Sequence, residues 1–141
     1  MSGKANAIAA YSRVANTETN PLQQVVMLYD GAIKFLRLAA NDIEAGDLAA
    51  RAAHTNRALD ILAYLQSILD FDRGGEVAPT LNLLYLSVTA ETLRAGARRD
   101  KAMMLRAAEL LVPVRDSWAS NAAGPAALPR VSAPVATVAL T

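Results

Sequence analysis

The fold is decided by residues 20–46, which read NPLQQVVMLYDGAIKFLRLAANDIEAG. Asn20 can accept a hydrogen bond from a free amide of a first helical turn, and Pro21 suits the first helical position because its missing N–H needs no partner there. Apolar residues then recur at intervals that place them on one helical face: Leu22, Val25, Val26, Tyr29, Ile33, Leu36, Ala40 and Ile43. Gly46 offers a left-handed stop, so the stretch predicts a long amphipathic helix that needs packing partners.

A second helix is predicted from Asp47, which can cap its first turn, to about Leu69. Its expected core-facing stripe is Leu48, Ala52, Thr55, Leu59, Leu62 and Leu69. The run Phe71-Asp72-Arg73-Gly74-Gly75 ends this helix, because adjacent glycines are unfavourable in a helix and common in a turn. A third helix begins within residues 76–79 and runs towards Ala97. Short turns between these segments predict that neighbouring helices lie antiparallel.

A fourth helix can begin at Asp100, another good capping residue. Pro113 interrupts its pattern. A proline deep in a helix removes one backbone hydrogen bond and presses against the carbonyl of Glu109, which costs about 3 kcal/mol if nothing compensates. We therefore expect a kink or an early helix end at Pro113.

The two ends of the chain lack a strong helical pattern. Residues 1–19 carry two sizeable apolar residues, Ile8 and Tyr11, before a polar run, and are predicted to form a flexible N-terminal arm. Residues 121–141 form an Ala/Pro-rich tail that is predicted to be disordered. Residues 20–120 then make one domain of the all-α class, an antiparallel four-helix bundle.

The composition limits what the chain can do. Its 141 residues are 53% hydrophobic and 19% charged, include no cysteine and carry a formal net charge of +1. This excludes thiolate metal ligands and disulfides and gives no global field that would attract nucleic acid or an anionic membrane. No run approaches the roughly 18 apolar residues of a membrane helix, and the N-terminus lacks a secretory signal. We expect a soluble, cytoplasmic protein without membrane insertion.

No catalytic arrangement is recognisable in the sequence. The single histidine, His54, has no second histidine or cysteine to join it in a metal site, and we expect an ordinary boundary residue, with a pH-sensitive contact as the alternative. No phosphate-binding loop, dinucleotide motif or Gly-x-Ser-x-Gly sequence occurs. Several carboxylates are expected to cap helices or face solvent: Asp30, Asp42, Glu44, Asp47, Asp60 and Asp116. We therefore predict a protein that is not an enzyme and needs no cofactor or metal.

Basic residues gather near the junction of the third and fourth helices: Arg94, Arg98, Arg99, Lys101 and Arg106. Nucleic-acid binding would need aromatic side chains beside them, and these are missing. Acidic neighbours such as Glu91 and Asp100 also offset the charge. Nucleic acid is therefore not an expected partner.

The second to fourth helices carry more apolar residues than one core-facing stripe requires. The additional residues, called here the predicted groove residues, are Ile61, Leu65, Ile68, Leu83, Leu86, Leu93, Met103, Leu110 and Val114. A thick core or the chain termini could cover them. Alternatively, they could line a groove for an apolar helical or extended peptide of another protein.

Several segments resemble one known family. Residues 20–36, and above all Leu28-Tyr29-Asp30-Gly31-Ala32, are similar to the opening helix of the flagellar secretion chaperone FliS family. Residues 69–78, LDFDRGGEVA, resemble that family's turn between its second and third helices. Further matching positions are Leu81, Leu84, Tyr85 and Trp118. The resemblance extends from about Ile8 to Ala119, with Asn20 standing where the family usually has another capping residue, serine.

The resemblance implies a cytoplasmic, non-enzymatic export chaperone. Its partners would be the C-terminal segment of flagellin, which it would keep from premature polymerisation, and a component of the flagellar type III export gate. Ile8 and Tyr11 match the family's two N-terminal anchors, which implies a role in gating the groove and in docking for export. A simple hydrophobic contact with the first helix is the alternative for these two residues.

Two other functions stay open at the level of sequence. The first is a structural helical bundle that self-associates through the predicted groove residues and has no client. The second is an enzyme with an unrecognised site. For a chaperone we expect a monomer or a weak homodimer when the client is absent.

Overall fold

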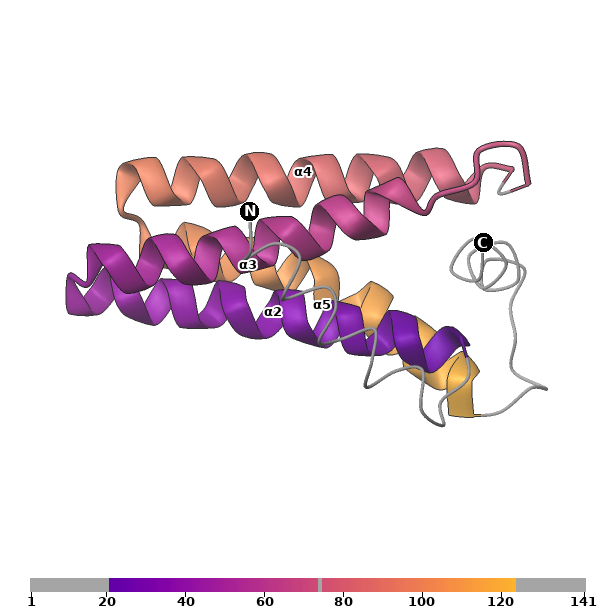
Figure 1. The fold of residues 1–141 in the computed structure, drawn as a ribbon, viewed down its shortest axis with the longest axis horizontal. Helices are drawn as coiled ribbons and strands as arrows, with labels where there is room; N and C mark the ends of the chain where they lie inside the picture. Colours follow the sequence, from indigo (N-terminus) through magenta and orange to yellow (C-terminus); the bar gives the residue numbers. More distant parts are fainter. Residues whose placement is uncertain (1–20, 74, 124–141) are drawn as a thin grey trace.

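The structure, a computed structural model, describes residues 21–73 and 75–123. It contains four helices: α2 (Pro21–Ala45), α3 (Leu48–Ser67), α4 (Val77–Arg98) and α5 (Lys101–Ala123). Within the described ranges there is no strand, and the helices pack together as a bundle (Figure 1). The predicted all-α four-helix bundle is confirmed. The predicted N-terminal arm with Ile8 and Tyr11 and the capping residue Asn20 lie outside the described residues. Of the predicted tail, residues 121–123 instead belong to α5, and the part beyond Ala123 lies outside the described residues.

The α2–α3 turn forms where its local sequence predicts. Gly46 adopts a φ of +74°, a left-handed conformation that glycine reaches without a steric penalty. The Asp47 carboxylate then accepts a hydrogen bond of 3.0 Å from the Ala50 amide and caps α3. One glycine and one capping side chain thus end one helix and begin the next.

The other two turns also rest on aspartate side chains. In the α3–α4 turn, one oxygen of Asp70 accepts hydrogen bonds from the amides of Asp72 and Arg73, at 3.0 and 3.1 Å. In the α4–α5 turn, Asp100 accepts one of 3.0 Å from the Met103 amide, after Arg99 has taken a left-handed conformation with φ 51°. These bonds satisfy backbone amides that would otherwise lack partners at a turn or a helix start.

Helix α5 continues through Pro113 to Ala123, so of the two expected outcomes, a kink or an early end, the early end is wrong. Pro113 and Glu109 are both exposed, which places the broken backbone hydrogen bond on the solvent side, where water can satisfy the free carbonyl. Leu111 and Trp118, on either side of the proline, are buried in the core. Packing of this inner face holds the helix together across the interruption.

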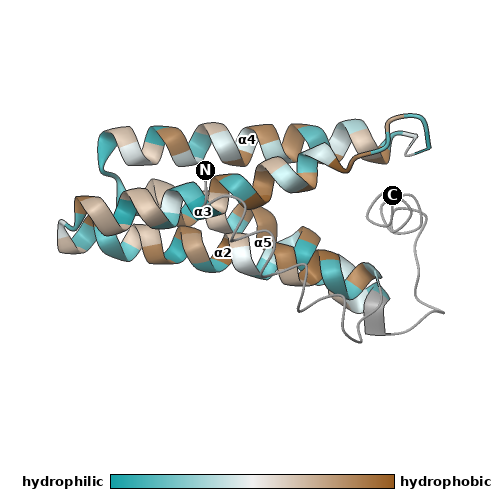
Figure 2. Ribbon diagram, in the orientation of Figure 1, coloured by the Kyte–Doolittle hydropathy of each residue, from teal (hydrophilic) through white to brown (hydrophobic). Residues whose placement is uncertain are grey.

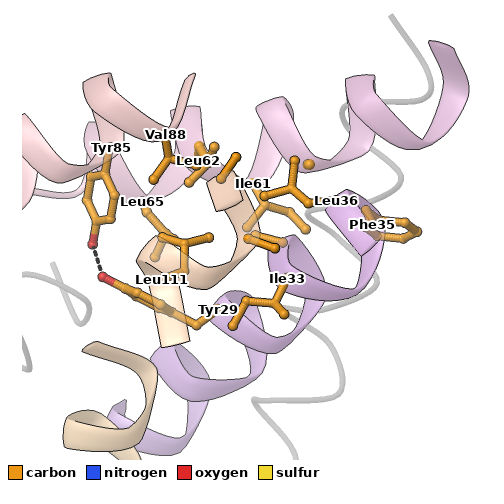
Figure 3. Packing of buried hydrophobic residues seen from close by; sticks show 14 of the residues in the cluster. Tyr29, Ile33, Phe35, Leu36, Ile61, Leu62, Leu65, Tyr85, Val88 and Leu111 are labelled. Carbon is orange, nitrogen blue, oxygen red and sulfur yellow. Dashed lines mark hydrogen bonds between the residues drawn. The ribbon is translucent and has the colours of Figure 1, made fainter. Parts of the chain in front are cut away.

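Each helix packs against its two neighbours in a ring, α2 on α3, α3 on α4, α4 on α5 and α5 on α2. The α2–α5 interface is the most extensive of the four and the α3–α4 interface the least. The core between them is continuous (Figure 3) and its largest fully buried side chains include Trp118, Tyr29, Tyr85, Leu36, Ile61, Leu62, Met104 and Leu111. No helix within the described ranges is both long and apolar enough to cross a lipid bilayer.

A buried tyrosine pair connects α2 to α4 across the core. The hydroxyl oxygens of Tyr29 and Tyr85 lie 2.8 Å apart and share a hydrogen bond (Figure 3). Burial raises the pKa of Tyr29 to about 12, and the hydrogen bond with Tyr85 opposes that shift. Burial likewise raises the pKa of Tyr85 well above its usual value. Both hydroxyls are therefore neutral at physiological pH and satisfy each other inside a largely apolar core.

Ion pairs cross the outside of the α2–α5 interface. The three pairs, called here the α2–α5 ion-pair row, are Asp30 with Arg115, Arg37 with Glu109, and Glu44 with Lys101. Their α2 members are seven residues apart, which brings all three to the same side of that helix. Such exposed pairs contribute about 0 to 1 kcal/mol each, so they support the register of the two helices more than the stability of the fold.

Candidate protein-binding groove

Three of the predicted groove residues lie inside the bundle. The exposed fractions of Ile61, Leu65 and Met103 are 0%, 2% and 9%, and all three belong to the hydrophobic core. Their helices turn these side chains toward the other helices rather than toward solvent. In this conformation they stabilise the fold and offer no surface to a partner, and a binding role for them stays a prediction.

Four other predicted groove residues are exposed leucines. Leu83, Leu86 and Leu93 on α4 are 66%, 47% and 55% exposed, and Leu110 on α5 is 45% exposed. The remaining two predicted groove residues, Ile68 and Val114, are half-buried. Figure 2 shows hydrophobic stretches recurring along the whole of α4, a helix that also buries apolar residues in the core. Helix α4 thus carries large apolar residues on its exposed side as well as in the core, although Ser87 and Arg94 are exposed there too.

A cleft of about 230 Å³ lies between α3 and α4 beside Leu93. Small residues leave the space for it, notably Ala52 on α3 and Gly96 and Ala97 on α4. The full lining, called here the α3–α4 cleft, is Arg51, Ala52, Thr55, Asn56, Thr92, Leu93, Gly96 and Ala97. Leu93 lines this cleft, and Leu86 and Leu83 precede it on the same helix, so the cleft and the exposed leucines of α4 together are the candidate groove.

The α3–α4 cleft also contains polar atoms without partners. Arg51 Nε, Thr55 Oγ1 and Thr92 Oγ1 are buried and form no hydrogen bond in the described part of the chain. Leaving a buried polar group unpaired costs about 1 to 3 kcal/mol. Arg51 also donates from Nη1 to the Gly96 carbonyl, while at the other end of the interface Gln66 donates to the Asn82 carboxamide oxygen over 2.7 Å. The interface thus has a side-chain hydrogen bond near Gln66 and unpaired polar atoms at the cleft.

His54 lies on a different side of α3, where that helix faces α2. Its Nδ1 lies 2.6 Å from an oxygen of Asp42, and its ring stacks on Phe35 with the ring centroids 6.1 Å apart. The Arg57 guanidinium lies 5.7 Å from the same phenyl ring centroid. This half-buried contact stabilises the α2–α3 interface rather than the candidate groove. Among the described residues, no three His, Asp or Glu side chains gather in a way that could hold a metal ion.

Sequence reasoning missed the cleft residues Arg51, Thr55 and Thr92. A signal was present, because both threonines occupy positions in the apolar stripes of their helices. A hydroxyl in such a position needs a partner, and the sequence could not show whether the helix backbone or a neighbouring helix would provide it. The arginine carried no distinguishing pattern.

The chain is similar in sequence to known proteins over all four helices. A sequence model of the family described as "Flagellar protein FliS" matches residues 4–125. The chain is 32% identical over 119 residues to the "Flagellar secretion chaperone FliS" of Salmonella typhimurium, an alignment that covers 81% of this chain and 88% of the relative. It is 26% identical over 102 residues to the "Flagellar secretion chaperone FliSB" of Pseudomonas aeruginosa, with coverage of 72% and 81%. A FliS of Bacillus subtilis is 26% identical over 113 residues, with coverage of 80% and 84%.

Proposed function

The chain belongs to the FliS family of flagellar secretion chaperones, and from this premise we propose that it binds the C-terminal segment of flagellin along α3 and α4. In the cytoplasm, such binding keeps flagellin from polymerising before export. The complex then reaches a component of the flagellar export gate, where the segment is released. This activity needs recognition and release of a client but no covalent chemistry.

The exposed leucines of α4 beside the α3–α4 cleft are the observation that supports this proposal most. Burying a leucine side chain that was exposed contributes about 1.5 to 3 kcal/mol. Several such contacts can offset the entropy that a disordered segment loses when it becomes ordered on a surface. A chaperone that must later release its client benefits from this balance.

The spacing of these leucines is compatible with a helical client segment. Leu83 and Leu93 are ten positions apart on α4, a distance of about 15 Å at the helical rise. An amphipathic client helix of about ten residues can lie along this length with its apolar face on the leucines, as in other helix-in-groove complexes. We propose this arrangement for one part of the flagellin segment.

Calorimetric titration with the C-terminal fragment of flagellin from the same organism tests the proposal. We expect one-to-one binding with a clearly negative heat-capacity change, because apolar surface is buried. Leu86→Ala and Leu93→Ala should each weaken binding by about 1 to 2 kcal/mol, or roughly five- to thirty-fold. Leu110→Ala is the matched control for location, because this leucine is equally exposed but lies on α5.

Two outcomes would contradict the proposal. If Leu110→Ala alone weakened binding, the client would lie along α5 and not in the groove proposed here. A stable dimer in analytical ultracentrifugation that does not respond to the flagellin fragment would instead support self-association, the rival use of the same leucines.

We also propose that Ile8 and Tyr11 occupy part of the groove until the client displaces them, and that they then take part in export docking. The proposal rests on the family resemblance at these two positions. A variant with alanine at both positions should change the affinity for the flagellin fragment and reduce flagellin export. Unchanged affinity together with unchanged export would reject this role.

A further inference from the structure

Three buried polar atoms without hydrogen-bond partners belong to residues that line the same cleft. The described residues contain four such side-chain atoms, and three of them belong to Arg51, Thr55 and Thr92, all of which line the α3–α4 cleft. The two threonine hydroxyls come from different helices, and Thr92 is completely buried. Because folded proteins pair most of their buried polar groups, three unpaired ones on residues of one cleft make that cleft a candidate for a polar ligand.

The chemistry of these atoms indicates which group would complete them. None of the ion pairs among the described residues involves Arg51, so its charge has no carboxylate partner there. Nη1 is occupied by the Gly96 carbonyl, which leaves the Nε edge of the guanidinium to donate. Each threonine hydroxyl can donate as well. A carboxylate has two oxygens with enough lone pairs to accept from all three groups, and its pairing with arginine is charge-assisted.

We propose that the α3–α4 cleft is an anchor pocket for a carboxylate side chain, an aspartate or glutamate of the bound client segment. This inference rests on the function proposed above and names a second determinant of binding at the same groove. Apolar residues of the segment lie on the α4 leucines, and the acidic side chain enters the cleft among the small residues. The three polar atoms are closed to solvent in the free protein, so side chains that line the cleft must move before the carboxylate can reach them. The leucines supply affinity, and the pocket fixes the register of the segment.

Replacing each threonine by valine separates recognition from a structural role. Thr55→Val and Thr92→Val keep the branched shape but remove an unpaired hydroxyl, so the melting temperature of the free protein should stay the same or rise. Affinity for the flagellin C-terminal fragment should nevertheless fall at least five-fold in each variant. A purely structural hydroxyl would give the same change in melting temperature with unchanged affinity. Thr92→Ser keeps the hydroxyl, and Thr89→Val on the same helix lies outside the cleft lining, so both controls should bind normally.

A matching series on the client identifies the carboxylate. Each aspartate or glutamate of the fragment is changed to its amide, one at a time, and a further fragment carries an amidated C-terminus. We expect one side-chain replacement to weaken binding at least five-fold to the unmodified chaperone and to have little further effect on Thr55→Val or Thr92→Val, as a double-mutant cycle requires for groups in contact. If only the amidated C-terminus had this effect, the terminal carboxylate would be the ligand and the side-chain proposal would be wrong. No effect from any replacement would reject the anchor pocket.

The same measurements distinguish failure of this inference from failure of the proposed function. If the fragment binds and Leu86→Ala weakens it while both threonine variants bind normally, the anchor pocket is rejected and the chaperone function stands. If the fragment does not bind the unmodified protein, the flagellin proposal is rejected and the anchor pocket with it.

Discussion

The α2–α5 and α3–α4 interfaces are both formed by amphipathic helices, but they differ in extent and in how their polar groups are paired. The α2–α5 interface is the most extensive in the bundle and carries the α2–α5 ion-pair row along its edge. The α3–α4 interface is the least extensive, contains a cleft with unpaired polar atoms, and lies beside exposed leucines. The α2–α5 interface has ion pairs within the chain, whereas the α3–α4 interface keeps polar atoms without partners. A binding partner could therefore bury more apolar surface and pair more polar atoms at the α3–α4 interface than at the α2–α5 interface.

The largest expected effect tests whether a buried predicted groove residue belongs to the fold or to the binding surface. Ile61→Ala should lower the free energy of unfolding by about 2 to 5 kcal/mol, because it leaves a cavity in the core. Leu83→Ala, at a residue that is 66% exposed, should change it by about 0.5 kcal/mol or less. Urea denaturation of both variants measures this. If Ile61→Ala changed stability little but weakened binding of the flagellin fragment, Ile61 would be accessible to the client.

The next effect concerns the tyrosine pair that connects α2 and α4 across the core. Tyr29→Phe or Tyr85→Phe alone should cost about 1 to 3 kcal/mol, since each leaves a buried hydroxyl without its partner. The double variant should cost less than the sum of the two, because no unpaired hydroxyl is left. Denaturation of the three variants tests this, and additive losses would show that the hydrogen bond contributes nothing.

The same pair predicts a pH dependence. The pKa of Tyr29 is raised from 10 to about 12 in the folded protein, so the unfolded chain loses its proton first as the pH rises. The stabilising contribution is therefore complete below pH 10 and is lost progressively as the pH rises from 10 towards 12. Unfolding free energies measured across this range should fall more steeply for the unmodified protein than for Tyr29→Phe. Parallel curves would contradict this cause of the pH dependence.

The smallest effect belongs to the α2–α5 ion-pair row. Arg115→Ala should cost at most about 1 kcal/mol, although its guanidinium contacts both oxygens of Asp30, because the pair lies at the surface. The loss should shrink as salt is added. Arg106→Ala, at an exposed arginine of the same helix, is the control and should be near neutral. A loss of several kcal/mol for Arg115 would mean that this interface depends on charge more than on its apolar packing.

The helix boundaries could be predicted from sequence because their signals are local. Gly46 and Asp47 act within one turn, and so does Asp100. Whether α5 ends at Pro113 could not be predicted from such local signals. The cost of a proline depends on whether its broken hydrogen bond faces solvent, and that depends on how the helix sits on its neighbours.

The groove was predicted less well than the fold, for a related reason. Periodicity showed two apolar stripes on α3 but could not show which of their members face inward. Leu48 and Ala52 were expected in the core and are exposed, whereas Ile61 and Leu65 were assigned to the groove and are buried. The rotation of a helix about its own axis is fixed by its contacts with α2 and α4, which no single segment of sequence contains. The exposed leucines of α4 were identified because that helix has large apolar residues on opposite sides.

The position of Trp118 gives the protein a built-in optical reporter. It is the single tryptophan of the chain, it is buried, and it follows Pro113 in α5. Its fluorescence therefore reports on the last turns of α5, which follow the backbone hydrogen bond that Pro113 removes. A shift of its emission to longer wavelength before the far-ultraviolet signal of the other helices is lost would reveal fraying of this end as a separate step. The same signal allows unfolding to be followed without attaching any dye.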